Sequence, residues 1–79
     1  MSQCVFVQIR CHPGKTYEVA EAVYDREIVS ELYSTSGDYD LLMKIYIPAG
    51  EDIGKFVNDN ILTIPGISRS LTTLTFKAF

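Results

Sequence analysis

The sequence predicts an α+β domain, in which a four-stranded antiparallel sheet carries two helices on one face. Three observations lead to this class. Residues 3–10 alternate between apolar and mixed side chains, as a strand does. Residues 53–61 repeat apolar side chains at helical spacing. The expected elements follow the order βαββαβ, and right-handed crossovers then place both helices on one face and leave the other face uncovered.

The first two elements are a strand and a helix. Within residues 3–10, Val5, Val7 and Ile9 share an apolar face. Residues 12–14 (His-Pro-Gly) end the strand, because proline fixes φ and glycine accepts turn conformations. Helical spacing then runs from Lys15 to about Arg26. One side of this helix is expected to carry Tyr17, Ala20, Val23, Tyr24 and Glu27.

A hairpin follows the first helix. Residues 28–36 are rich in β-branched and aromatic side chains and predict a second strand. Its alternation places Ile28 and Leu32 opposite Val29, Glu31 and Tyr33. Residues 37–40 form a turn, and residues 41–47 predict a third strand. Its apolar face consists of Leu41, Met43, Ile45 and Ile47.

The last two elements are again a helix and a strand. Glu51 and Asp52 follow a Pro-Ala-Gly turn and suit the positive end of a helix. The apolar face of that helix consists of Ile53, Phe56, Val57 and Ile61. An Ile-Pro-Gly step at residues 64–66 ends it, and the Thr-rich residues 68–79 predict a long fourth strand.

The uncovered face of this sheet predicts self-association. It is expected to carry Phe6 and Tyr46, or their register neighbours, among Gln, Lys and Thr side chains. Such a face is too apolar for solvent and too polar for a monomer's core. The chain is expected to form one domain, residues 1–79, and a domain of this size has a small margin of stability. We therefore expect two sheets to pack face to face.

Composition excludes several classes of function. The net charge is −3 and basic residues are scattered, so we expect no direct nucleic-acid binding. No apolar stretch approaches the roughly 20 residues of a membrane span, and no signal-peptide pattern is present. We expect a cytoplasmic protein with no membrane partner. Cys4 and Cys11, about 23 Å apart on one strand, cannot pair, which suits a reducing compartment.

Motifs for catalysis, metals and cofactors are missing from the sequence. The single histidine, His12, stands at a strand end, where a surface turn residue is the simpler interpretation. There is no Cys-x-x-Cys and no histidine pair for a metal. The five glycines are dispersed and form no phosphate loop. We expect no enzyme activity, no metal and no cofactor.

One polar turn could bind a ligand. Gly37, Asp38, Tyr39 and Asp40 combine backbone N–H groups, which suit a carboxylate, with two carboxylates, which suit an ammonium group. These are the two ends of an amino acid. The simpler interpretation is that Asp38 and Asp40 only stabilise the hairpin through hydrogen bonds to the backbone. The last strand adds hydroxyl groups, which are common in strands, at Ser70, Thr72 and Thr73.

Three segments in order resemble a known family. They are Ser36-Gly37-Asp38-Tyr39-Asp40 leading into Leu41-Leu42-Met43-Lys44, then Leu62-Thr63-Ile64-Pro65-Gly66-Ile67, then Ser70-Leu71-Thr72. Each segment alone is weak, but their order and spacing resemble the C-terminal effector domain of Lrp/AsnC transcription regulators, also called the RAM domain. The resemblance covers nearly the whole chain.

The resemblance implies a fold, an assembly and a ligand. It implies the ferredoxin-like βαββαβ fold, dimers formed by two sheets as a dimeric α+β barrel, and rings of four or five dimers (octamers or decamers). It also implies that a small effector, commonly an amino acid, binds between dimers at the turn between strands two and three.

By the same resemblance, each candidate site residue receives a role. The ligand-binding candidates are Ser36, Gly37, Asp38, Tyr39, Asp40, Ser70, Thr72 and Thr73. Asp40 is expected to bind the α-ammonium group, and the backbone of Gly37 and Asp38 the carboxylate. The three hydroxyl groups are expected to support the ligand from the same or a neighbouring subunit. Replacing Asp40 by alanine is expected to abolish binding and to spare the fold.

The sequence departs from the family pattern at its start. Family regulators carry a helix-turn-helix domain before this region, whereas here the first strand begins almost at Met1. The chain is therefore expected to lack its own DNA-binding domain. Co-assembly with full-length Lrp/AsnC regulators, amino-acid sensing and modulation of a metabolic partner all remain open.

Two alternatives to an effector-binding domain remain. A small dimeric α+β-barrel enzyme of the monooxygenase type pairs two similar sheets, and fold alone does not determine function. Such enzymes use Trp, Asn or His in the sheet cavity, whereas this chain has no Trp and one peripheral His. A purely structural assembly module is the other alternative.

Overall fold

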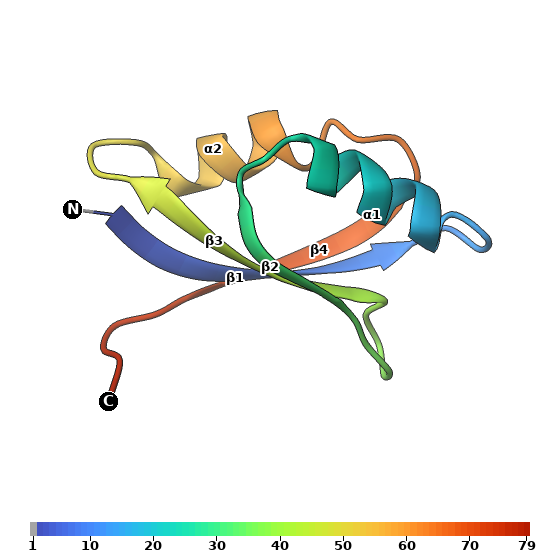
Figure 1. Cartoon of the computed structure of the whole chain (residues 1–79), viewed down its shortest axis with the longest axis horizontal. Helices are drawn as coiled ribbons and strands as arrows, with labels where there is room; N and C mark the ends of the chain where they lie inside the picture. The colour runs from blue at the N-terminus through green and yellow to red at the C-terminus, as the bar shows by residue number, and fades with distance from the viewer. Residues whose placement is uncertain (1) are drawn as a thin grey trace.

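The predicted fold class is confirmed by a computed structural model that describes residues 2–79. Its elements, in chain order, are β1 (Ser2–Cys11), α1 (Thr16–Asp25), β2 (Val29–Ser34), β3 (Leu41–Pro48), α2 (Ile53–Asn60) and β4 (Ile67–Leu74). The four strands form one antiparallel sheet in the order β2-β3-β1-β4. Both helices cover one face of that sheet, and no helix covers the other face (Figure 1).

The core lies between the helices and the two central strands. Alternate residues of β1 and β3 are buried, as their sequence patterns predict. Val5 lies opposite Ile45 and Val7 opposite Met43, so the two apolar faces are in register. The helices and the loop after α2 complete the core with Val19, Val23, Val57, Ile61 and Ile64.

The predicted core side of α1 is wrong for its two tyrosines. Tyr17 and Tyr24 are 83% and 74% exposed, whereas Val19 and Val23 are fully buried. Valine and the neighbouring small alanines allow the helix to approach the sheet closely, whereas two phenol rings would hold it away. The helix also lies close to the loop before β4, since a Cβ atom added at Gly66 would lie 2.9 Å from Val19 Cγ2.

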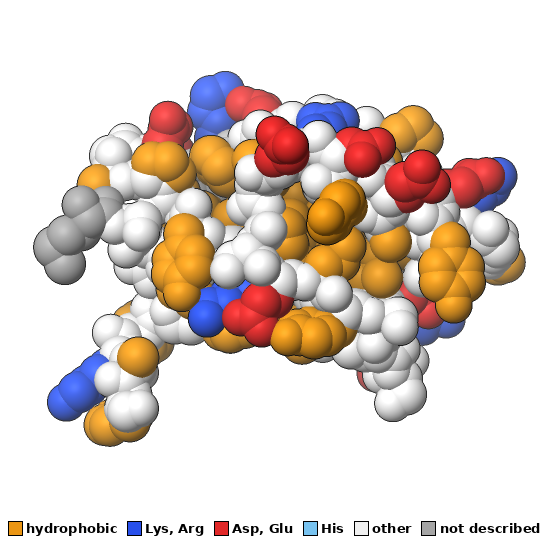
Figure 2. All heavy atoms as spheres, viewed as in Figure 1, with side chains coloured by type: hydrophobic (Ala, Val, Ile, Leu, Met, Phe, Trp, Pro, Cys, Tyr) orange, Lys and Arg blue, Asp and Glu red, His pale blue; other side chains and the backbone are white. Residues whose placement is uncertain are grey.

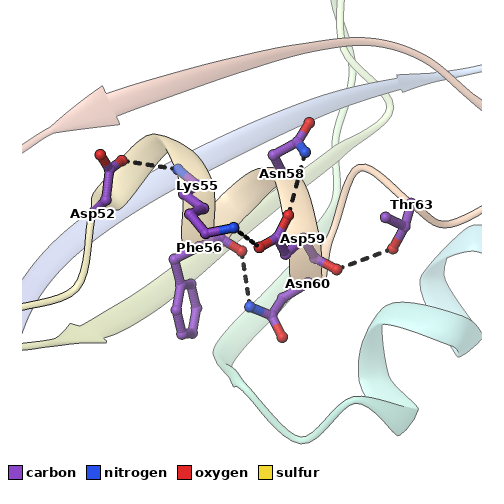
Figure 3. A network of polar contacts seen from close by, with 7 residues as sticks. All are labelled: Asp52, Lys55, Phe56, Asn58, Asp59, Asn60 and Thr63. Atoms are coloured by element: carbon purple, nitrogen blue, oxygen red, sulfur yellow. Dashed lines mark hydrogen bonds and ion pairs between the residues drawn. The ribbon is translucent and has the colours of Figure 1, made fainter.

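The predicted apolar face of α2 is confirmed. Val57 and Ile61 are buried, and Ile53 and Phe56 pack against the core. Asp52 caps the helix, because its Oδ1 accepts a hydrogen bond from the backbone N–H of Lys55 at 3.0 Å. Figure 3 shows this cap and the polar contacts along the solvent side of the helix, including the bond from Asn60 Nδ2 to the carbonyl of Phe56.

Two strand predictions need correction. The pairing of β2 with β3 shifts between Val29 and Glu31, so the extra residue reverses the alternation. Val29 and Leu32 therefore share the core side, opposite Ile45 and Met43, and are not on opposite faces. The fourth strand ends at Leu74, not at residue 79.

The cysteines lie as expected, on opposite faces of β1 and unpaired. Cys4 is half-buried on the uncovered face, and Cys11 is buried on the helix side. Burial raises the pKa of the Cys11 thiol, a hydrogen bond with Thr16 partly offsets this, and the nearby charge of Asp40 raises it further. Cys11 is therefore a thiol, not a thiolate, at neutral pH.

Candidate functional site

The topology brings four strand ends together at one end of the sheet. Because β1 and β2 run antiparallel to β3, the ends of β1 and β2 meet the starts of β3 and β4 there. A cavity of about 300 Å³ lies at this end. It is lined by Arg10, Cys11, His12, Pro13, Gly14, Thr16, Asp40 and Ser68.

Asp40 joins the β2–β3 loop to the end of β1. Its backbone N–H donates to the carbonyl of Ile9 at 2.8 Å, and its carbonyl accepts from Thr35 N at 2.9 Å. Its side-chain Oδ2 accepts from the backbone N–H of Cys11 at 2.8 Å. Within residues 2–79, Oδ1 accepts no hydrogen bond. One carboxylate oxygen thus stabilises the backbone, while Asp40 also lines the cavity.

This bond changes what is expected of an Asp40 variant. Cys11 N lies next to the irregularity that shifts the β1–β4 register between Arg10 and Cys11. An alanine at position 40 would leave this part-buried N–H without its acceptor. We therefore revise the expectation that alanine spares the fold: the substitution should destabilise the fold by the free energy of that bond.

The rest of the turn presents free backbone N–H groups. Ser36, Gly37 and Asp38 are exposed, Tyr39 is half-buried, and Gly37 adopts a left-handed conformation with φ of 98°. In the described chain, the backbone N–H groups of residues 37–39 donate no hydrogen bond. Two bonds hold the turn by its carbonyl groups instead: Thr35 Oγ1 donates to Tyr39 and Arg10 Nη1 donates to Asp38.

Two arginines beside the turn were not predicted as site residues. Arg10 and Arg69 are directly opposed on β1 and β4, on the uncovered face. Arg10 contacts the carbonyl of Asp38 at 2.8 Å, and the Arg69 guanidinium lies 5.5 Å from the centre of the Tyr39 ring. Neither forms a salt bridge within the described residues. The position of Arg10 at the end of the alternating first strand could have indicated a site residue, whereas no sequence pattern indicated Arg69.

The three predicted hydroxyl groups do not converge. Ser70 lies opposite Ile9, whose carbonyl binds Asp40, so Ser70 is one strand away from the turn. Thr72 lies opposite Val7, on the helix side but farther along β4. Thr73 lies opposite Phe6 and therefore belongs to the uncovered face. Of these three residues, only Ser70 stands beside the end of the sheet that carries the cavity.

The uncovered face carries a polar cluster among aromatic side chains. Lys44 Nζ lies 3.4 Å from Glu31 Oε2, and Tyr33 donates to Glu31 Oε1. The bond from Tyr33, followed by that from Lys44, lowers the pKa of Glu31. Bonding to Tyr46 and to Glu31 raises the pKa of Lys44. Tyr33 and Tyr46 are exposed on this face, and Phe6 is half-buried there, as predicted for Phe6 and Tyr46.

The described residues contain neither a metal-binding cluster nor a membrane-spanning helix. Within residues 2–79, no group of three His, Cys, Asp or Glu side chains is arranged to hold a metal ion. His12 is exposed at the turn after β1. Neither helix in this part of the chain is long and apolar enough to cross a membrane.

Comparisons with known proteins identify one family over nearly the whole chain. The family model described as the Lrp/AsnC ligand binding domain matches residues 4–79. The HTH-type transcriptional regulator FL11 of Pyrococcus abyssi is 36% identical over 76 residues, which cover 96% of this chain and 50% of that protein. The chain thus spans about half the length of the curated relatives it matches.

Solved structures show the same fold. TTHA0845 from Thermus thermophilus is 31% identical with a TM-score of 0.87, covering 98% of this chain and 96% of that one. The transcriptional regulator NMB0573 from Neisseria meningitidis, solved as a complex with L-Met, is 18% identical with a TM-score of 0.81. It covers 95% of this chain and 50% of that one.

Proposed function

Because the chain belongs to the Lrp/AsnC ligand binding domain family, we propose that it binds an amino-acid effector and assembles into homodimers and larger oligomers in transcriptional regulation. The observation that carries the proposal is the cavity beside Asp40, which adjoins a turn with free backbone N–H groups. An amino acid needs this combination because it carries one cationic and one anionic group.

In this proposal, Asp40 binds the α-ammonium group. Its Oδ2 is already bonded to Cys11 N, so the orientation of the carboxylate is set before a ligand arrives. Its Oδ1 retains its full capacity to accept hydrogen bonds from an ammonium group in the cavity. A preoriented acceptor loses less conformational entropy on binding than a free side chain does.

The α-carboxylate is bound by the turn. The N–H groups of Gly37 and Asp38 are free donors, and the left-handed conformation of Gly37 belongs to the backbone geometries that form anion-binding concavities. Arg10 and Arg69 lie at the base of the same turn and add positive charge. Ser36, Tyr39 and Ser70 flank this region, whereas Thr72 and Thr73 lie farther along β4 on opposite faces and receive no contact to the effector in this proposal.

Self-association through the uncovered sheet face is the second part of the proposal. Leu71, Tyr33 and Tyr46 are exposed on this face, together with the half-buried Phe6. Several large apolar side chains exposed on one face are uncommon on soluble monomers. Packing against a second copy buries it, and rings of dimers (octamers or decamers) then place the turns of neighbouring dimers around the effector.

The effector proposal is tested by a thermal-shift screen against the twenty amino acids at millimolar concentration, followed by calorimetry. L-Met is included because it is the ligand in the NMB0573 complex. A selective rise in the melting temperature is expected, since a ligand of the folded state stabilises it. A flat panel on a folded oligomer would favour the purely structural assembly module.

A charge-only variant tests the role of Asp40. In Asp40→Asn, the amide oxygen still accepts from Cys11 N, so binding should fall at least about tenfold, as for a lost charge-assisted bond, while the fold persists. Asp52→Asn is the matched control, because it makes the same chemical change at the cap of α2. Equal affinity in the two variants would refute the assignment.

Regulatory output is proposed through full-length relatives. The curated proteins that this chain matches are HTH-type transcriptional regulators about twice the length of the matched region. A shared sheet face allows mixed dimers of this chain with such a regulator. Co-purification of the tagged chain with a family regulator, quantified by native mass spectrometry, tests this. Homodimers alone in the presence of excess regulator would argue against mixed assembly.

A further inference from the structure

The chain after β4 forms an arm that leaves the sheet on the uncovered side. This C-terminal arm comprises residues 75–79, and in Figure 1 it descends from the sheet away from both helices. Two hydrogen bonds fix its first residue: Gln3 Nε2 donates to the carbonyl of Thr75 at 2.7 Å, and Thr75 Oγ1 donates to the carbonyl of Cys4 at 2.7 Å. The departure of the arm is therefore a bonded feature of the fold.

The arm carries two phenyl rings that this fold does not bury. Phe76 is 96% exposed and Phe79 is fully exposed. Lys77 Nζ lies 5.0 Å from the centre of the Phe79 ring, and this is the one cation–π contact of the arm in the described chain. Beside the arm, the uncovered face is hollowed into a groove of about 360 Å³. Its apolar wall consists of Cys4, Phe6, Tyr46 and Ala78, and Lys44 and Lys77 flank it.

The shape of the uncovered face suits a second copy of this chain. The arm projects at one end and the β2–β3 loop projects at the other, so the face between them has a concave profile in this view (Figures 1 and 2). A two-fold dimer requires one surface to present both a projection and the groove that receives it. Here the projecting phenyl rings and the apolar groove are adjacent on the same face.

The area available from the arms is substantial for a dimer. An aromatic side chain buries roughly 150–250 Å², so the four phenyl rings of two arms would bury roughly 600–1,000 Å² in a dimer. A stable interface buries about 1,200–2,000 Å² in total. The arms would therefore supply about half of such an interface, and the sheet faces would supply the rest.

We propose that the C-terminal arm clamps the homodimer, with Phe76 and Phe79 of each copy inserted against Phe6 and Tyr46 on the partner's uncovered face. The aromatic groove receives the rings edge to face, and Lys44 and Lys77 contribute cation–π contacts. This inference rests on the homodimer of the proposed function and assigns about half of the dimer contact to the arms.

A single tryptophan reports the position of the arm directly. The chain contains no Trp, so Phe76→Trp introduces one fluorophore. Its emission should be that of a buried indole at concentrations where ultracentrifugation shows dimers, and should move to that of an exposed indole on dilution. Tyr24→Trp, on the solvent side of α1, is the control and should stay exposed throughout. Exposed emission from Phe76→Trp in the dimer would overturn the proposal.

A second measurement separates the arm from the dimer itself. The double variant Phe76→Ser/Phe79→Ser should raise the dimer dissociation constant about a hundredfold or more, as loss of central aromatic contacts does. Its monomer should melt like the wild-type monomer at a dilution where both are dissociated, because neither ring packs on its own fold. Tyr17→Ser/Tyr24→Ser is the matched control. A wild-type monomer would refute the homodimer and the clamp together, whereas a dimer with an unchanged constant would refute the clamp alone.

Discussion

Replacing Asp40 by alanine should destabilise the fold, because the Asp40 carboxylate bonds the backbone of the neighbouring strand. The 2.8 Å contact from Cys11 N to Oδ2 is a charge-assisted bond at a part-buried site. Such bonds contribute about 1.5–3 kcal/mol, and an orphaned N–H costs about 1–3 kcal/mol. We expect about 2 kcal/mol for Asp40→Ala, which lowers the melting temperature of a domain this size by about 8–16 °C.

The assay is urea unfolding followed by circular dichroism at one fixed protein concentration, because dimerisation would otherwise shift the midpoint. Asp38→Ala is the matched control, since the Asp38 carboxylate accepts no hydrogen bond within residues 2–79 and its loss should change stability by less than about 0.5 kcal/mol. Hydrogen exchange of the Cys11 amide should accelerate only in Asp40→Ala. Equal midpoints and equal exchange in the two variants would refute the reasoning.

Three further predictions concern the glycine turns, the helix cap and the polar cluster. Gly66→Ala combines a left-handed φ of 99° with a Cβ clash and should destabilise the fold by more than about 2 kcal/mol. Gly50→Ala has a similar φ but open space around it, and should destabilise the fold by about 1 kcal/mol. Equal losses of stability in urea unfolding would contradict the clash. Asp52→Ala removes the cap of α2 and should destabilise the fold by about 1 kcal/mol. Asp52→Asn keeps a capping oxygen and should destabilise it much less, and urea unfolding of both variants tests this difference. Tyr33→Phe removes the main cause of the lowered pKa of Glu31, so an NMR titration should show that pKa rise toward 4.5. A carboxyl group whose pKa is lower in the folded state stabilises the fold at pH values above its unfolded-state pKa. That contribution is lost as the pH falls through the folded-state pKa. The variant lacks most of this contribution, so it should lose less stability on acidification than the wild type does.

Strand and helix order followed from the sequence because apolar residues repeat with the period of each element. The alternation of Val5, Val7 and Ile9 determined the core side of β1 correctly, and the same held for β3 and α2. The apolar pattern did not predict the buried side correctly in α1, where two sides of the helix have a similar apolar content. There the tyrosines extend the apolar side, but only packing distance against the sheet decides that valine and alanine face inward.

Features that depend on pairing between strands could not be predicted from the sequence. The bulge in β2 comes from its register with β3, and no local pattern marks it. The same holds for the candidate site: the turn at residues 37–40 was visible as a motif, but Arg69 and Ser68 reach it only because β4 pairs with β1. Thr72 and Thr73 were grouped with Ser70 by sequence proximity, whereas a strand sends successive side chains to opposite faces.

The position of β1 in the sheet has a consequence for how this chain folds. β1 is the first strand along the chain, yet it lies between β3 and β4, and β4 is the last. Ile9 must therefore pair with Ser70, which is separated from it by most of the sequence, before the sheet is complete. Loop closure of that length is an entropic cost that comes before the contacts that offset it, so folding should take place in milliseconds or longer, not microseconds. During synthesis, β1 emerges from the ribosome before β3 and β4, and one of its edges stays unpaired until β4 emerges.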